Sequence, residues 1–152
     1  MPKRAKAKTV SEVFAERVHA VRKSRGWTQQ ELANRLAELG AALHQTAVAK
    51  VENGTRKVSL DDAFLFATAL EVSPTWLVTM PSGTDPVAVA PKVQCSPAVV
   101  RGWLRGAAPL PGHSARAFFS EAPDEVWDRM VTVGEFATYQ GQVEADDTDG
   151  GQ

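Results

Sequence analysis

The sequence has little cysteine and histidine, which are common metal ligands and catalytic residues. Its 152 residues include one cysteine and three histidines, and His19, His44 and His113 show no metal-ligand spacing. No phosphate-binding Walker loop, nucleotide-binding glycine pattern or nucleophile elbow is present. We therefore expect a protein that is not an enzyme and that holds neither a cofactor nor a metal ion.

Cysteine and long hydrophobic runs are equally scarce. Cys95 has no second cysteine with which to form an internal disulfide, which favours a reducing cytosol, and we interpret it as a small buried hydrophobe. The basic first residues lead into SEVFAERV and give no sign of a signal peptide. No segment approaches the roughly 20 apolar residues of a membrane span. We expect a cytoplasmic protein with no membrane partner.

Positive charge is scarce in the second half of the chain and concentrated in the first. Residues 1–57 hold 12 Lys and Arg against 5 Asp and Glu, whereas residues 58–152 hold 5 against 13. A basic half indicates a polyanionic partner. Charge alone is equally compatible with a solvated surface of mixed sign.

The stretch Thr28–Gly54 predicts two short helices joined by a turn. Thr28 and Glu31 have the spacing of a capping box, and apolar residues follow at helical intervals. Gly40 can supply the positive φ that ends the first helix. The second helix begins near Gln45, directs Ala47, Val48 and Val51 inward, and ends at Gly54. Two helices around a glycine turn form a helix-turn-helix.

These residues resemble the Cro/repressor-type (Xre) helix-turn-helix family. The resemblance is carried by Thr28–Ala33 (TQQELA), Thr46–Val48 (TAV) and Val51–Gly54 (VENG), and it extends from about Val10 to Leu77. The turn between the two helices is about five residues longer than the compact family turn, which marks a variant. The resemblance implies a DNA-binding transcriptional regulator.

Candidate DNA contacts follow from the family geometry. Gln45 at the start of the second helix can pair with adenine, and Lys50 suits guanine or a phosphate. Gln29 opens the preceding helix, where a phosphate can bind, and in related proteins this residue also braces the first recognition Gln. His44 is expected to cap the second helix, to meet a phosphate or only to pack in the turn. The candidate base contacts are Gln45, Thr46, Ala49 and Lys50, and the candidate phosphate or supporting contacts are Gln29, His44, Asn53, Arg56 and Lys57.

Further helices are predicted on either side of this motif. A helix over 11–25 precedes it, with Arg22 on the outside and His19 solvated or structural. Trp27 is expected to pack in the core. After the motif, Ser59 and Asp62 form a second capping box for a helix with a predicted inward stripe, and Ser73 starts a last short helix. The stripe consists of Leu60, Ala63, Phe64, Ala67 and Leu70, with Leu65 opposite and Phe66 at its flank. The predicted fold class is all-α, a five-helix repressor-like bundle.

The remaining chain predicts a linker and a small helical region. The domains are a basic flexible arm (1–8), the helix-turn-helix domain (9–80), a Pro-rich linker (81–94) with at most a short strand at 87–89, a helical C-terminal region (95–142) and an acidic disordered tail (143–152). The arm either touches DNA or only aids solubility. Helices are predicted after Ser96, Ser114 and Pro123.

One helix of the C-terminal region has two open interpretations. Leu43, Val48, Val51 and Gly54 map at a constant offset of 52 onto Cys95, Val100, Trp103 and Gly106, as in a degenerate second recognition helix with Arg101 and Arg105 outward. Because a proline-rich segment replaces the supporting helix, core or subunit packing is the simpler interpretation.

The sequence is compatible with two functions. The first is a sequence-specific repressor, a homodimer that occupies a two-fold operator in double-stranded DNA through residues 45–52 and is associated with the nucleoid. The second is an antitoxin or adaptor whose C-terminal aromatic residues bind a protein partner. The aromatic residues in question are Trp103, Phe118, Phe119 and Trp127.

Overall fold

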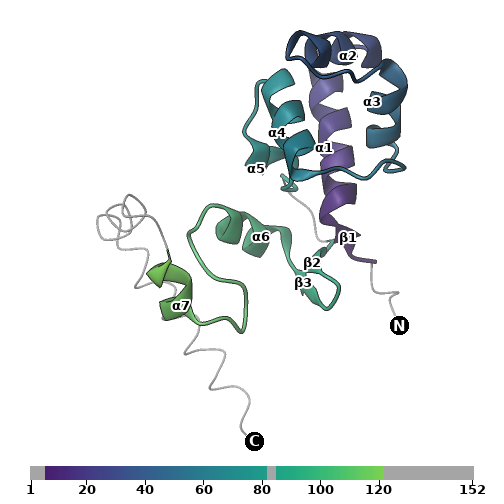
Figure 1. The fold of residues 1–152 in the computed structure, drawn as a ribbon. Coiled ribbons are helices and arrows are strands. Elements are labelled where there is room, and N and C mark those ends of the chain that lie inside the picture. Colours follow the sequence, from purple (N-terminus) through teal and green to yellow (C-terminus); the bar gives the residue numbers. More distant parts are fainter. Residues whose placement is uncertain (1–5, 82–84, 122–152) are drawn as a thin grey trace, which may run out of the picture. The chain divides into compact units, whose positions relative to one another are not determined.

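The computed structural model describes residues 6–81 and 85–121, and these are rich in helix (Figure 1). In chain order the elements are β1 (Lys8–Thr9), α1 (Val10–Ser24), α2 (Gln29–Glu38), α3 (Gln45–Glu52), α4 (Leu60–Ala69), α5 (Pro74–Leu77), β2 (Val87–Ala90), β3 (Val93–Cys95), α6 (Pro97–Leu104) and α7 (Ala115–Ser120). Within the described residues, every helix is too short or too polar to cross a membrane.

Capping boxes begin three of the helices. The predicted boxes are confirmed: the Thr28 hydroxyl accepts from the Glu31 amide at the start of α2, and Ser59 accepts from Asp62 at the start of α4. A third box, formed by Thr9 with Glu12, begins α1 one residue earlier than the apolar pattern indicated. Each box satisfies amide groups that a helix start leaves without partners.

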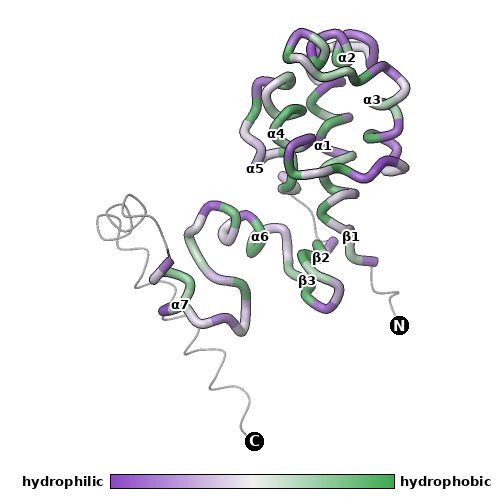
Figure 2. Tube along the Cα trace, in the orientation of Figure 1, coloured by the Kyte–Doolittle hydropathy of each residue, from purple (hydrophilic) through white to green (hydrophobic). Residues whose placement is uncertain are grey.

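Buried side chains from α1 to α5 form one hydrophobic core. It is built around Phe14 of α1, Leu32 of α2, Val48 of α3, Phe66 of α4 and Leu77 of α5, all at most 2% exposed. The Phe14 and Phe66 rings meet edge to face at 5.9 Å between centroids, a favoured geometry for aromatic pairs. In Figure 2 the hydrophobic stretches of α1 and α4 lie inside this domain, and hydrophilic residues lie over α2.

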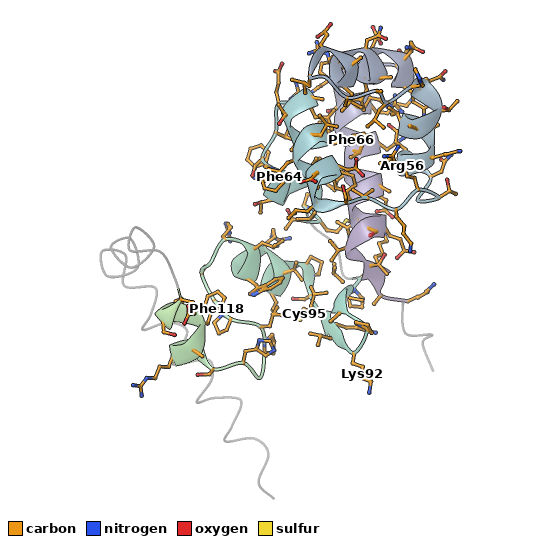
Figure 3. The ribbon with its side chains drawn as sticks, in the orientation of Figure 1. Arg56, Phe64, Phe66, Lys92, Cys95 and Phe118 are labelled. Carbon is orange, nitrogen blue, oxygen red and sulfur yellow. The ribbon has the colours of Figure 1, made fainter. Side chains whose placement is uncertain are left out.

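The predicted inward stripe of α4 is partly wrong. Leu60 and Phe64 are 74% and 56% exposed, whereas Phe66 is fully buried. Ala63, Ala67 and Leu70 are buried as predicted. Figure 3 shows Phe64 on the outer side of α4 and Phe66 directed towards α1. The helix has apolar residues on nearly every side, so periodicity could not select the buried one.

The prediction of an all-α fold is wrong in part, because the structure contains a three-stranded sheet. Its strand order is β1-β2-β3, with β1 parallel to β2 and β2 antiparallel to β3. Lys8 pairs with Val87 and Thr9 with Ala88, so backbone immediately before α1 joins the proline-rich stretch. The prolines of this stretch do not prevent the pairing, because Pro86 and Pro91 flank β2 and leave its amides free to bond.

Two short helices follow the sheet. Ser114 caps α7 as predicted, accepting from the Ala117 amide at 3.2 Å. Phe119 is 2% exposed, and its ring meets that of Phe118 at 5.0 Å, nearly perpendicular. By contacts the chain divides into two compact units, with the boundary after Val100, inside α6. The predicted helix from Pro123 and the acidic tail lie outside the described residues, as does most of the basic arm.

Candidate nucleic-acid interface

Helix α3 is buried along one side and exposed along the other. Val48 and Val51 are at most 1% exposed, which attaches the helix to the core. Gln45, Thr46 and Lys50 are exposed, and Ala49 is partly exposed among them. Because exposed positions at i, i+1, i+4 and i+5 share a helix face, these four candidate base contacts lie together.

His44 precedes α3 without capping it through its side chain. It occupies the N-cap position with extended backbone, its side chain is exposed, and it makes no capping hydrogen bond. The prediction that the His44 side chain caps α3 is therefore wrong. The first amides of α3 therefore lack a side-chain partner from this residue, and helix starts with unsatisfied amides attract anions.

A single carboxylate at the end of α3 joins three helices. Glu52 has a side chain only 2% exposed and accepts hydrogen bonds from α1 and α2. Arg22 donates from Nε to Oε1 at 2.5 Å and from a terminal nitrogen to Oε2 at 2.8 Å. Gln29 Nε2 donates to Oε2 at 2.9 Å, and His19 Nδ1 lies 3.0 Å from the same oxygen. The bonds fix the carboxyl end of α3 against its neighbours.

These contacts determine the ionisation of Glu52. Burial alone would raise the pKa of its carboxyl, but the hydrogen bonds from Arg22, Gln29 and His19 outweigh burial and lower the pKa to about 2. The carboxylate is therefore charged at neutral pH. A negative charge at a helix carboxyl end is unfavourable by itself, and Arg22 compensates for it.

The sequence did not predict the roles of two residues in this network. Arg22 was expected outside, but it is 4% exposed and also donates to the Trp27 carbonyl at 2.6 Å. Glu52 was noted only as part of the VENG segment. Its partners lie 23 to 33 residues away in sequence, so spacing could not reveal them. The one available signal was the position of Arg22, which follows Phe14 and Val18 at four-residue spacing on the buried side of α1.

The supporting candidates occupy varied environments. Gln29 bonds to Glu52, so its side chain holds α2 to the end of α3. Asn53 is the exposed C-cap of α3, and Lys57 is exposed in the following connection. Arg56, in the same connection (Figure 3), lies 3.5 Å from Asp62 in an ion pair whose side chains are 33% and 18% exposed. Of these three residues after α3, Arg56 is the one paired with α4, through Asp62.

Trp27 packs against the core as predicted and also carries two arginines on its ring. The guanidinium carbons of Arg35 and Arg25 lie 3.8 and 5.2 Å from the ring centroid. Both arginines approach Glu71, at 3.6 and 3.7 Å. Stacking on an indole holds each cation in place. Trp27, Arg35 and three polar residues of α2 line a shallow hollow of about 250 Å³.

Among the described residues, no group of three or more His, Cys, Asp or Glu side chains could hold a metal ion. Cys95 is buried, and burial raises the pKa of its thiol, which disfavours a thiolate. These findings concern residues 6–81 and 85–121 alone.

The arrangement of α2 and α3 defines a DNA-binding domain of the helix-turn-helix class. Residues 18–77 match the model of a protein family described as helix-turn-helix. The chain belongs to this family, as a regulator of the Cro/repressor type. The family consists of DNA-binding regulators and not of enzymes.

Two solved structures are similar to part of the chain. The restriction-modification controller protein C.AhdI from Aeromonas hydrophila is 33% identical, with a TM-score of 0.39, over 44% of this chain and 94% of that one. A hypothetical transcription factor, NHTF from Neisseria, is 29% identical, with a TM-score of 0.43, over 47% of this chain and 77% of that one. No curated protein sequence matches significantly.

Proposed function

We propose that the protein is a sequence-specific regulator that represses transcription by occupying an operator in double-stranded DNA through residues 45–52. The observation that supports this most directly is the exposed face of α3, which carries Gln45, Thr46 and Lys50 while Glu52 fixes the helix from behind. A helix held rigidly with polar side chains outward suits the major groove. Occupying a promoter blocks transcription without any chemical step.

The proposal divides the candidate residues by role. Gln45, Thr46, Ala49 and Lys50 read base edges, because they share the exposed face of α3. Phosphates are held by residues that flank this face: His44, Asn53, Arg56 and Lys57. Gln29 supports α3 through Glu52. The proposed DNA-binding domain comprises residues 9–80. The proposed location of the protein is the cytoplasm, in association with the nucleoid.

We further propose that the protein acts as a homodimer on a two-fold operator. Leu60 and Phe64 lie one turn apart on α4, and Trp76 on α5 is 61% exposed. Exposed apolar residues on neighbouring elements indicate an association surface. A two-fold dimer presents two α3 helices and so requires a symmetric site, with half-sites about 34 Å apart or a multiple of this.

The alternative function, an antitoxin or adaptor, has less support. It depends on the aromatic residues of the C-terminal region, of which Phe119 is buried and Trp127 lies outside the described residues. Trp103 and Phe118 are only partly exposed. A chain cut after Ser96 keeps β1 paired with β2 and tests this role. Full operator affinity and dimerisation of that fragment would leave the C-terminal region available for a protein partner.

Selection of bound sites from random duplex DNA, followed by a salt titration of the selected site, tests the main proposal. We expect a symmetric consensus and an affinity that falls steeply with salt, because phosphate contacts release counterions. A consensus without symmetry would reject the two-fold operator. Binding without sequence preference at any salt concentration would reject sequence-specific regulation altogether.

A further inference from the structure

Helix α6 repeats the local structure of α3 at the distance of 52 residues noted in the sequence. Both helices contain eight residues, at matching positions. Gly54 and Gly106 follow them with φ of 68° and 70°. The next amides bond back alike, from Thr55 to the Lys50 carbonyl and from Ala107 to the Gly102 carbonyl, each at 2.9 Å.

The side of α6 that corresponds to the exposed side of α3 carries arginine. Ala49 and Lys50 of α3 match Arg101 and Gly102, and Asn53, the residue after α3, matches Arg105, the residue after α6. Arg105 is exposed, and Arg101 and Gly102 are partly exposed. The position equivalent to Gln45 is Pro97, which is buried and has no side-chain donor. Of the four positions equivalent to the candidate base contacts, Pro97, Ala98 and Gly102 have no side-chain donor, and only Arg101 has one. This side of the helix is therefore better suited to phosphates than to base edges.

The surrounding sequence is basic, although the second half of the chain is acidic in total. Residues 86–120 contain four Lys and Arg, namely Lys92, Arg101, Arg105 and Arg116, and no Asp or Glu. The acidic residues of the second half lie before and after this segment. A basic segment without any acidic residue attracts a polyanion.

Gly102 supplies an independent observation. It lies inside α6, where glycine is a poor helix former. There is room for a side chain there, because a Cβ added to Gly102 would meet no atom of the described residues within 4 Å apart from the helix's own backbone. Its φ is not in the left-handed region, so the backbone does not require glycine either. A bare helix surface between two arginines allows close approach of a ligand to the backbone.

We propose that α6 is a second DNA-contacting helix, which holds backbone phosphates of duplex DNA through Arg101 and Arg105 beside the bare surface of Gly102. The proposal rests on the proposed DNA-binding function and adds a contact outside the helix-turn-helix. The helix reads no sequence. It increases affinity and salt dependence, while α3 selects the site.

The first test compares full-length variants on the selected operator and on a 30-bp random duplex, from 50 to 300 mM KCl. Arg101→Gln combined with Arg105→Gln is expected to weaken both complexes alike and to reduce the slope of log K against log salt by about two, since each phosphate contact contributes about 0.9. Lys57→Gln, in the helix-turn-helix domain, is the reference and is expected to reduce the slope by about one.

This experiment distinguishes failure of the α6 proposal from failure of the proposed DNA-binding function. If Lys57→Gln reduces the slope and the double variant does not, α6 has no DNA contact and the proposed function stands. If wild-type binding shows no salt dependence, both proposals fail. The Arg105 Nε also donates to the Arg101 carbonyl at 3.2 Å. A variant Arg105→Gln that lowers only the melting temperature would assign Arg105 to closing the helix and overturn the proposal.

A second variant avoids any loss of folding. Gly102→Glu adds a good helix former at an open position and a negative charge at the proposed contact. We expect an unchanged or higher melting temperature and at least tenfold weaker binding to both duplexes. Ala117→Glu, on an exposed position of α7, adds the same charge elsewhere and is the matched control. Equal binding by these two variants would overturn the proposal.

Discussion

Arg22 of α1 and Glu52 of α3 form a two-pronged ion pair in which both carboxylate oxygens accept from the same guanidinium, at 2.5 and 2.8 Å. Both side chains are at most 5% exposed. The pair holds α3 against α1 on its buried side. The exposed side of α3 carries Gln45, Thr46 and Lys50, which take no part in the pair. The position of the helix is thereby separated from the side chains proposed to read DNA.

Removing one member of this pair is expected to destabilise the protein strongly. Glu52→Ala leaves the guanidinium of Arg22 buried without its partner, which costs about 3 kcal/mol or more. Arg22→Met combined with Glu52→Leu removes both charges and is expected to recover most of the loss. Urea unfolding of the full chain measures these differences. Glu38→Ala, at an exposed position of α2, is the control and is expected to change stability by less than about 0.5 kcal/mol.

The same carboxylate predicts a loss of stability in acid. Its pKa is lowered from 4.5 to about 2 by folding, so its contribution is complete above pH 4.5 and is lost as the pH falls towards 2. A shift of this size corresponds to about 3 kcal/mol. We expect the stability difference between the wild type and Glu52→Gln to disappear across this window. Capping residues Glu12 and Glu31, whose pKa values are also lowered, are present in both proteins and cancel. A difference independent of pH would contradict the prediction.

Local motifs explain why part of the fold could be predicted. The boxes at Thr28 and Ser59 depend on residues three positions apart, and Gly40 ends α2 with a φ of 88° as expected. Such signals lie within one helical turn and need no tertiary information. The helix-turn-helix was therefore visible in the sequence.

Non-local pairings explain what could not be predicted. β1 and β2 pair across nearly 80 residues, and two residues of strand give no periodic pattern. The partners of Glu52 come from two other helices. On α4, Leu60 and Phe64 are as apolar as Phe66, so only the packed structure separates exposed from buried residues. These features depend on which elements meet.

Substitution of Gln45 is expected to alter specificity. Gln45→Ala removes a side chain proposed to pair with adenine, so discrimination at one base pair of each half-site is expected to fall by about 1–3 kcal/mol. Lys57→Ala removes a proposed phosphate contact and is expected to weaken all sites alike. Repeating the site selection with each variant distinguishes the two outcomes. An unchanged consensus for Gln45→Ala would remove this residue from base recognition.

The exposed apolar residues of α4 predict a change in oligomeric state. Phe64→Asp places a charge on the proposed association surface, so we expect sedimentation equilibrium to show a monomer at micromolar concentration. Folding is expected to be little affected, since the side chain is 56% exposed. Leu39→Asp alters an exposed leucine, 48% exposed, that follows α2, and should leave the dimer intact. A dimer that survives Phe64→Asp would place self-association elsewhere.

Glu71 predicts a stabilising substitution. It follows α4 with a φ of 52°, the left-handed conformation that costs an ordinary residue about 1 kcal/mol or more and glycine almost nothing.

Glu71→Gly relieves this cost but loses the contacts to Arg25 and Arg35. These are long ion pairs, at 3.7 and 3.6 Å, from a side chain that is 68% exposed, and such pairs contribute only a few tenths of a kcal/mol. Relief of the backbone therefore outweighs the lost charge, and urea unfolding is expected to show a gain of about 0.5 kcal/mol. Glu71→Ala loses the same contacts and keeps the strained backbone, so it is expected to be less stable than the wild type. If the glycine variant were no more stable than the alanine variant, the backbone at this position would not be strained. If it were more stable than the alanine variant but less stable than the wild type, the ion pairs would be the larger contribution at this end of α4.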